Sequence, residues 1–416
     1  MVLRRDSFSD RVCDDLSEVL LQYLSLEDKL KLECVSKQFQ RTIFQRHYVF
    51  DERFLYFSGF SSHPSLDRKR RFEKFSSILK KCPNIRIIDL YDKQLFESNL
   101  QIISNNLSHS PEIHLHFNAL SDDISNELFT TFVEKFGSKL KCFKIYSETN
   151  WKRLISLPNI SELEFSNYWI PPNSQTITQL NFDKLNKCQI TFTNENIDSI
   201  DVLFDKFKSV RHLDVDIWGL NRSNAQLVVN QLSKLNKLID LRYRIRYSAE
   251  LLKQITLNCS QLKRIYLTPF VKLGDHINQL LSPFIALKQL KRLYLIFNWS
   301  GDPFNPNNNT FSLKSFGKLS NITHLELFTY SSKFKTDETF IEDIETVFPN
   351  LQFLIIIGFR FKASFNKLKQ RLIGLITRME RLQKIHLNQK YRKRQKEENK
   401  EIIIKSTPKW KTIESE

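Results

Sequence analysis

Arginine and tyrosine alternate with apolar residues in three short segments of this sequence. The polar positions of these segments are Asp240, Arg242 and Arg244; Arg264 and Tyr266; and Arg292 and Tyr294. Clustered arginine suits carboxylate or phosphate, and arginine with tyrosine is typical of protein-binding hot spots. A strand whose polar side chains are simply solvated shows the same alternation. Recognition by these residues therefore depends on whether the fold brings them together.

Signals of catalysis are weak by comparison. The sequence contains no H-E-x-x-H, P-loop, G-x-S-x-G or G-x-G-x-x-G motif. His114 and His116 alternate and could ligate a metal, but no Cys or carboxylate at ligand spacing supports them, so ordinary strand or loop histidines are favoured. Six scattered cysteines without a C-x-x-C pair indicate reduced, mostly buried thiols. We therefore expect a non-catalytic protein without a cofactor or metal.

One template, apolar-x-x-apolar-x-apolar, recurs along most of the chain, at intervals of 20 to 32 residues from Leu140 onward. Its copies are Ile85/Ile88/Leu90, Leu140/Phe143/Ile145, Ile160/Leu163/Phe165, Leu185/Cys188/Ile190, Val210/Leu213/Val215, Leu238/Leu241/Tyr243, Leu262/Ile265/Leu267, Leu290/Leu293/Leu295, Ile322/Leu325/Leu327, Leu351/Leu354/Ile356 and Leu382/Ile385/Leu387. The longer gap after Ile85 leaves room for a degenerate repeat near residues 112–115. Such self-similarity is the signature of a repeat architecture.

The alternation within the template predicts a short strand with one buried face, and the intervening residues read as helices, for example 195–204, 248–255 and 337–344. Stacked in parallel, the strands would form one continuous sheet in chain order. This pattern resembles the leucine-rich-repeat family, although the family's usual Asn is present only as Asn298. Residues 300–309 have the composition of a loop insertion. The alternative is another α/β fold with parallel strands.

In such a solenoid, the residues between the apolar positions face the open, concave side of the sheet. Stacking would place Arg242, Arg244, Arg264, Tyr266, Arg292 and Tyr294 in one patch, which we predict to bind another protein. His324 and Phe328 would extend this patch. Earlier repeats present Glu162, Glu164, Asp214 and Asp216 instead, so the face should change sign along its length.

The first fifty residues follow a different pattern. Leu16, Val19, Leu20, Tyr23 and Leu24 fall on one helical face. Residues 25–28 (Ser-Leu-Glu-Asp) resemble the capped start of a second helix, and a third apolar stripe runs from residue 35 to 43. Three short helices make only a marginal core, so such a module usually needs a partner surface. A cap for the first repeat is the alternative interpretation.

This segment resembles the F-box family in Tyr23-Leu24, Ser25-Leu26-Glu27-Asp28 and Val35-Ser36-Lys37-Gln38-Phe39. It departs from the family where Val12-Cys13 replaces the usual Leu-Pro, and Phe39 stands where the family often has Trp. The resemblance implies docking on the Skp adaptor, and through it on a cullin, while the repeats hold a substrate. The residues implied in the Skp interface or the core of the module are Val12, Leu16, Leu20, Leu24, Leu30, Val35 and Phe39.

Composition limits the choice of partner only broadly. Lys and Arg number 63 against 46 Asp and Glu, and the net charge of +17 favours an acidic or phosphorylated protein, nucleic acid or an anionic surface. Two basic runs, residues 68–71 and 390–396, read as localisation signals, phosphate sites or solvated charge. No signal peptide or membrane-length apolar run is visible, the longest near the C-terminus being 353–357. We expect cytoplasmic or nuclear localisation and no membrane association.

The resulting prediction is an α/β leucine-rich-repeat solenoid, with parallel strands on the concave side and helices on the convex side, preceded by a small all-α F-box module. Its parts are the module (1–50), a linker and cap (51–80), about eleven or twelve irregular repeats (81–388) and a charged, disordered tail (389–416). The predicted function is substrate recognition for a cullin-RING ubiquitin ligase. The alternatives are a repeat scaffold without a ligase role and, less favoured, a basic nucleic-acid binder.

Overall fold

The structure is a computed structural model. It describes residues 113–117, 126–145, 157–165, 174–194, 197–217, 219–246, 249–271, 282–299, 310–329, 335–336, 339–361, 364–393, 396–406 and 411–414, the short segments 49–51 and 87–90, and the single positions 19, 24, 73, 76, 77 and 80. The chain forms two compact units, unit 1 (Met1–Leu185) and unit 2 (Asn186–Glu416). Each unit is described by itself.

Unit 1 carries parallel strands that pair in chain order. They are β1 (Val49–Asp51), β2 (Ile87–Leu90), β3 (Ile113–Phe117), β4 (Leu140–Ile145) and β5 (Glu162–Phe165). The degenerate repeat predicted near residues 112–115 is confirmed as β3, whose register with β4 shifts between Ile113 and His114. Helix α7 (Asn126–Phe136) precedes β4 and buries Phe132 and Phe136, and α9 (Ser174–Gln179) follows β5.

Unit 2 continues the same repeat. Its parallel strands, paired in chain order, are β6 (Lys187–Thr191), β7 (His212–Asp216), β8 (Asp240–Arg246), β9 (Arg264–Val271), β10 (Arg292–Trp299), β12 (His324–Thr329), β14 (Phe353–Ile357) and β15 (Lys384–Lys393). The predicted parallel ladder in chain order is thereby confirmed within this unit. A separate two-stranded sheet joins β11 (Thr310–Phe311) and β13 (Lys335–Thr336).

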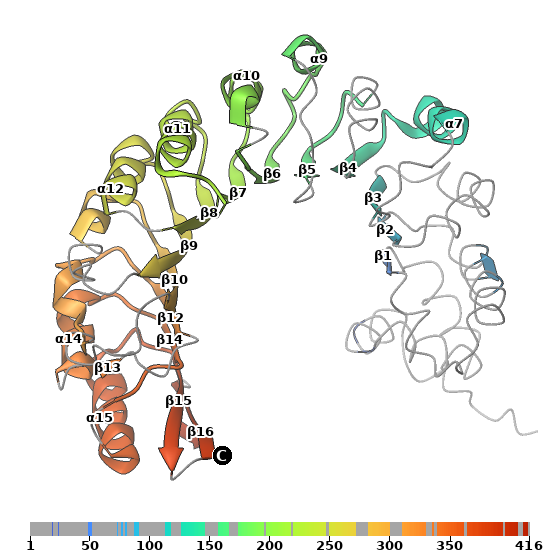
Figure 1. The fold of residues 1–416 in the computed structure, drawn as a ribbon. Coiled ribbons are helices and arrows are strands. Elements are labelled where there is room, and N and C mark those ends of the chain that lie inside the picture. Colours follow the sequence, from blue (N-terminus) through green and yellow to red (C-terminus); the bar gives the residue numbers. More distant parts are fainter. Residues whose placement is uncertain are drawn as a thin grey trace, which may run out of the picture. The chain divides into compact units, whose positions relative to one another are not determined.

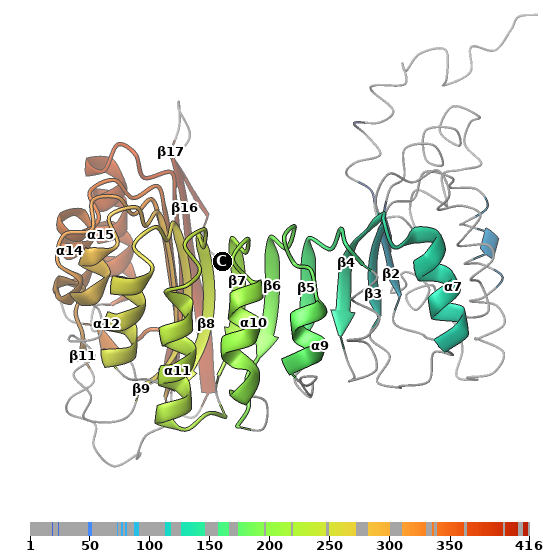
Figure 2. The same ribbon diagram turned by 90° about the horizontal axis from the view of Figure 1, so that it is seen from above.

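Helices connect the strands and lie together on one side of the sheet of unit 2 (Figures 1 and 2). They are η3 (Ile197–Ser199) with α10 (Ile200–Lys206), α11 (Arg222–Leu232), α12 (Ala249–Asn258), η4 (Ser282–Ala286), η5 (Leu313–Phe316), α14 (Phe340–Val347) and α15 (Phe365–Arg378). The Asn221 side chain caps α11 by accepting from the Asn224 backbone N–H at 2.8 Å. The helical sequences predicted at 195–204, 248–255 and 337–344 correspond to α10, α12 and α14.

The core lies between the sheet and the helices. Leu293, Leu325 and Leu354 hold matching positions on neighbouring strands and are fully buried. From Leu140 onward, the first apolar residue of each template is also buried, at the turn that leads into the strand; Leu262 and Leu290 are examples. Because each repeat contributes one strand and a few apolar side chains, its stability depends on its neighbours.

Backbone hydrogen bonds at these turns tie each repeat to the next. The Arg211 carbonyl accepts from the N–H groups of both Ile239 and Asp240, at 2.9 and 3.0 Å, and the same arrangement recurs in later repeats. Asparagine side chains add bonds between repeats here, since Asn350 donates to the Ser320 carbonyl at 2.7 Å. Backbone and side-chain hydrogen bonds therefore both link neighbouring repeats.

The C-terminal residues contradict one prediction. The tail from residue 389 was expected to be disordered, but β15 runs on to Lys393, and β16 (Lys396–Ser406) and β17 (Lys411–Glu414) pair antiparallel beyond it. Ile402 and Ile404 on β16 are fully buried. The lysine and glutamate content suggested disorder, yet two buried isoleucines at alternate positions are enough to close the last repeat of the solenoid.

The predicted F-box module lies almost entirely outside the described residues. Val12, Leu16, Leu20, Leu30, Val35 and Phe39 are all outside them. Val19 is helical and 46% exposed, while Leu24 is half-buried at a bend. The Skp-binding prediction therefore stays a prediction. Within the described parts of the chain, no helix is long and apolar enough to cross a membrane.

Candidate protein-binding surface

The sheet of unit 2 has one side covered by helices and one open face, defined as the outward side chains of its parallel strands. Burial alternates along the strands, as in β14, so inward residues are buried and outward residues are partly exposed. Strand register aligns the outward side chains in rows. The middle row reads Gln189, Asp214, Arg242, Tyr266, Tyr294, Glu326, Ile355 and His386. Side chains from distant parts of the sequence are therefore neighbours.

The outward residues of β7, β8 and β9 form what we call the charged half of the open face. Three ion pairs join neighbouring strands there: Asp214–Arg242 at 3.5 Å, Asp216–Arg244 at 3.2 Å and Asp240–Arg264 at 3.0 Å. The acidic and the basic residues predicted for this face lie on adjacent strands. Where the charge of the face was expected to change sign, these residues therefore form ion pairs between neighbouring strands. Glu162 and Glu164, the other acidic residues expected on this face, are half-buried on β5 of unit 1.

Burial affects the electrostatics of the charged half. Loss of water raises the pKa of Asp214, and Arg242 and Arg244 oppose this rise. The first row, which precedes the middle row along each strand, reads His212, Asp240, Arg264, Arg292, His324, Phe353 and Lys384. In this row, the His212 Nδ1 atom lies 3.3 Å from the Asp240 carboxylate and 3.3 Å from the Arg264 guanidinium. Arg242, Arg244 and Arg264 are thus already engaged with side chains of this protein.

Two tyrosines of the predicted patch stack on each other. The rings of Tyr266 and Tyr294 lie 3.6 Å apart at 6°, and the Arg242 guanidinium lies 4.6 Å from the Tyr266 ring centre. Tyr294 is only 8% exposed, and burial together with Tyr294 raises the pKa of Tyr266. The sequence prediction correctly placed these side chains next to one another. Their mutual contacts leave less of each available to a partner.

The outward residues of β10, β12 and β14 differ in character. Ile296, Phe328, Phe353, Ile355 and Ile357 project from the open face, and we call them the apolar half. All five side chains are partly exposed. Only Phe328 was included in the sequence prediction. The available signal was the uninterrupted apolar run 353–357, in which the outward positions of a repeat strand are apolar as well as the inward ones.

Titratable groups border the apolar half. Arg292 and Lys384 occupy its first row, with His324 and Phe353 between them as stacked rings 4.4 Å apart. Burial raises the pKa of Glu326, and Arg292 and Lys384 partly offset that rise. Burial also lowers the pKa of His324, with a further contribution from Arg292. Neither Arg292 nor Lys384 has a carboxylate within 4 Å among the residues that the structure describes.

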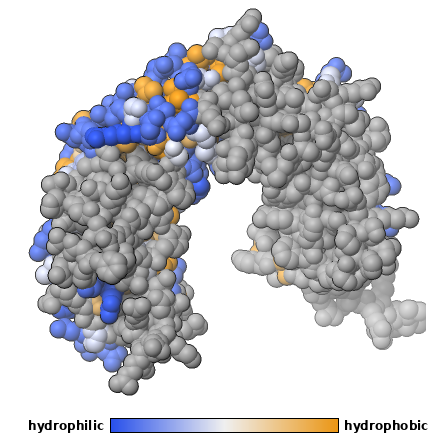
Figure 3. All heavy atoms as spheres, viewed as in Figure 1, coloured by the Kyte–Doolittle hydropathy of each residue, from blue (hydrophilic) through white to orange (hydrophobic). Residues whose placement is uncertain are grey.

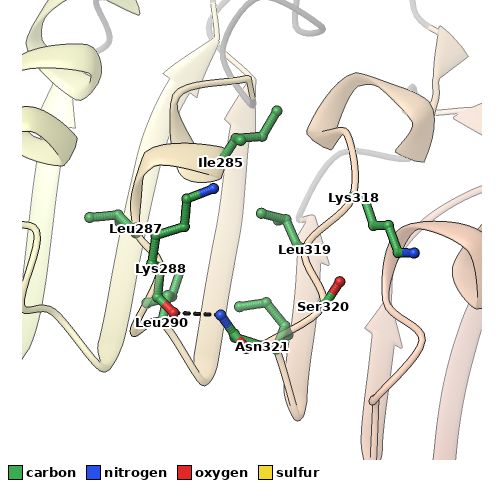
Figure 4. Close-up of a pocket in the computed structure, with 9 residues that line it drawn as sticks. Ile285, Leu287, Lys288, Leu290, Lys318, Leu319, Ser320 and Asn321 are labelled. Atoms are coloured by element: carbon green, nitrogen blue, oxygen red, sulfur yellow. Dashed lines mark hydrogen bonds between the residues drawn. The ribbon is translucent and has the colours of Figure 1, made fainter.

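Other parts of unit 2 offer less. A hollow of about 110 Å³ between two repeats is lined by Lys288, Lys318 and Asn321 among others, and Asn321 donates to the Lys288 carbonyl there (Figure 4). Small-molecule sites are usually about 300–1,000 Å³. The coloured surface in Figure 3 carries hydrophilic residues with hydrophobic ones among them. Leu227 on α11 and Leu257 on α12 are exposed hydrophobic residues of the helical side. The open face is therefore the better candidate.

Reactive groups are few among the described residues. Cys142, Cys188 and Cys259 are free and buried, and burial raises the pKa of Cys259 to about 12. Thiols of this kind are unreactive. His114 and His116 lie on β3, and no group of three His, Cys, Asp or Glu residues that could hold a metal occurs in the part of the chain described.

Comparison with known proteins gives limited information. No protein-family model and no curated protein match the sequence. Solved structures with a similar fold include LegL7, a leucine-rich-repeat-containing protein from Legionella pneumophila (12% identity, TM-score 0.37, covering 76% of this chain and 96% of that chain), and the yeast Rad7–Elc1 complex (14% identity, TM-score 0.36, covering 85% of this chain and 94% of that chain). These identities are too low to assign a function.

Proposed function

We propose that this protein is the substrate-recognition subunit of a cullin-RING ubiquitin ligase. Residues 1–50 would bind the Skp adaptor, and the open face of unit 2 would bind the substrate protein. Substrate binding by the open face is supported by one observation. In the apolar half, five partly exposed apolar side chains from three adjacent strands form one surface. Apolar surface of this kind, rimmed by polar residues, marks protein interaction sites.

Support for the ligase half comes from the sequence alone. The match to the F-box pattern in residues 15–39 lies directly before the repeats, and that order of modules is itself a hallmark of the family. A solenoid needs no catalytic residue in this role, because it holds a substrate near the ubiquitin-loaded enzyme and raises its effective concentration. The chemistry resides in other subunits.

Copurification with Skp and cullin tests the ligase half. The wild-type chain should retain both proteins, and Leu20→Asp combined with Phe39→Ala should lose them, because an unpaired charge on an apolar face is costly. Leu257→Asp is a matched control, since Leu257 is 62% exposed on α12 and its replacement should change nothing. If wild-type protein never retains Skp, the F-box assignment is wrong and a scaffold without a ligase role becomes the better account.

Crosslinking mass spectrometry of the captured substrate tests the other half. Crosslinks should map to residues that flank the open face of unit 2. A substrate whose crosslinks map only to the helical side would contradict the proposed binding surface. Nucleic-acid binding by the charged half is less favoured because Arg242, Arg244 and Arg264 are paired with carboxylates, whereas phosphate binding needs cations that are available.

A further inference from the structure

The apolar half restricts the backbone conformation of a partner. Strands β10, β12 and β14 each pair on both sides, so no free strand edge is available there for an added strand. The backbone N–H and C=O groups of an extended segment would face Phe328 and the isoleucines without hydrogen-bond partners, at a cost of about 1–3 kcal/mol per group. A helix satisfies its own backbone groups and needs only side-chain contacts.

Spacing favours a helix that crosses the strands. Neighbouring strands lie about 4.8 Å apart, and residues three or four apart in a helix rise by about 4.5–6 Å. Apolar residues at i, i+3 or i+4, and i+7 would therefore meet Ile296, Phe328 and Ile357 in turn, which are paired across β10, β12 and β14. Same-face residues of an extended chain, about 6.6–6.8 Å apart, would fall out of step with them.

Charge at the border restricts the partner further. Arg292 on β10 and Lys384 on β15 lie in the same row, three strands apart, with the His324–Phe353 stack between them. Neither has a carboxylate within ion-pair distance among the described residues, in contrast to the arginines of the charged half. Three strand spacings amount to about 14 Å, or about nine to ten residues of helix.

We propose that the apolar half binds an amphipathic helix of the partner protein. Its apolar stripe would cover Ile296, Phe328, Ile355 and Ile357, and carboxylates beside the stripe would pair with Arg292 and Lys384. This inference rests on the proposed function, because it specifies the chemistry of the substrate segment that the open face would take. Binding of such a helix would remove water from the centre of the site and leave charge pairs at its rim, as in strong protein interfaces.

Peptide display on the full-length chain provides a direct test. A library of random peptides about 16 residues long would be selected on wild-type protein, after depletion on the Phe328→Asp, Ile355→Asp double variant. The expected consensus has apolar residues at helical spacing and an excess of Asp and Glu. Selected peptides should gain helical circular dichroism on binding. An alternating apolar consensus, a basic consensus, or no peptide that depends on these two residues would overturn the proposal.

Affinities of a selected peptide then separate the two contributions. The double variant in the apolar half should weaken binding by more than about tenfold, as loss of central anchors does. Arg292→Gln with Lys384→Gln should weaken it less and reduce its salt dependence, since exposed charge pairs are screened. Lys253→Gln, an exposed residue of α12 on the helical side of the sheet, is the matched control and should bind normally. Equal loss in this control would point to general disruption and would contradict the proposed site.

These outcomes are distinguishable from failure of the proposed function. Absence of Skp binding would leave the peptide result untouched, because the selection does not involve residues 1–50. A natural substrate that crosslinks to the open face through an extended or basic segment would overturn the helix proposal and leave the ligase assignment intact.

Discussion

The charged half and the apolar half of the open face belong to one sheet, with the same strand spacing and the same hydrogen-bonded turns. In the charged half, each carboxylate lies opposite an arginine of the next repeat, as in Asp214–Arg242 and Asp240–Arg264. In the apolar half, Phe328 and Ile357 lie opposite each other and remain partly exposed. The parallel register therefore pairs the charged side chains of the charged half with one another. It leaves the apolar side chains of the apolar half available to a partner.

This difference changes how the basic residues should be read. Arg242, Arg244 and Arg264 suggest an anion site when each repeat is considered alone. Across the strands they are matched by carboxylates, and exposed pairs of this kind contribute little energy. Among the described residues, Arg292 and Lys384 have no carboxylate within ion-pair distance and interact with Glu326 from farther away, so they are the cations on this face better suited to an external anion.

The largest effect is expected at the strand that closes the apolar end. Ile402→Asp with Ile404→Asp would place two charges at fully buried positions of β16. Loss of each isoleucine alone should cost about 2–5 kcal/mol. Hydrogen exchange should accelerate strongly in β14 and β15 and much less in β7–β9, because each repeat contacts only its neighbours. Uniform acceleration would show that the two halves unfold as one unit, and unchanged exchange would contradict the closing role of β16.

The next largest effect is the difference in stability between substitutions of an inward-facing and an outward-facing residue of β10. Leu293→Ala removes a fully buried side chain and should cost about 2–5 kcal/mol. Ile296→Ala, on the half-exposed outward side of the same strand, should cost less than about 1.5 kcal/mol. Urea unfolding of both variants measures the difference. Equal costs would mean that Ile296 belongs to the core, and the apolar half would lose one of its members.

A double-mutant cycle on Asp214 and Arg242 measures how far the charged half is satisfied internally. The Arg242 side chain is 50% exposed, so a coupling of about 0.2–1 kcal/mol is expected, falling with salt. Asp214→Ala, Arg242→Ala and the double variant are compared by urea unfolding. A coupling indistinguishable from zero at low salt would mean that the pair is not formed in solution and that Arg242 is available for a partner.

The smallest effect concerns Glu326, which lies in the middle row between Tyr294 and Ile355, on the same strand as Phe328. Burial raises its folded-state pKa, so its ionised form destabilises the fold, and that cost appears as pH rises above the unfolded-state pKa of about 4.3. Glu326→Gln should therefore raise the thermal midpoint slightly at pH 7 and lose this advantage at pH 4. His324 is present in both proteins, so its own titration cancels. A lowered midpoint at pH 7 would indicate that Glu326 is stabilised by Arg292 and Lys384.

Much of the fold could be predicted from sequence because the repeat encodes it locally. In every copy of the template from Ile160 onward, the first residue is buried at a turn and two buried residues lie on a strand, and the eleven copies predict the order of the strands. The weak repeat at β3 was located because the gap after Ile85 was too long for one repeat. The closing strand β16 was missed because its lysines and glutamates hide Ile402 and Ile404, whose burial requires β15 beside them.

The candidate site could be predicted only in part. The outward positions were identified correctly, so Tyr266 and Tyr294 were expected to be neighbours. Whether an outward side chain is available to a partner depends on side chains about one repeat away. Asp214 pairs with Arg242, for example, and this pairing can be recognised only when the strand register is known. The run 353–357 consists entirely of apolar residues, so alternation cannot mark which of them point outward. Register with β12 resolves this ambiguity.

Binding of the captured substrate to two double variants tests the central claim most directly. One variant, Arg242→Gln with Arg264→Gln, alters the charged half, and the other, Phe328→Asp with Ile355→Asp, alters the apolar half. Skp binding and the thermal midpoint serve as folding controls for both. The account predicts near-normal substrate affinity for the first variant and a loss of more than about tenfold for the second. Lost affinity in the first variant with normal affinity in the second would contradict it and return the site to the arginines.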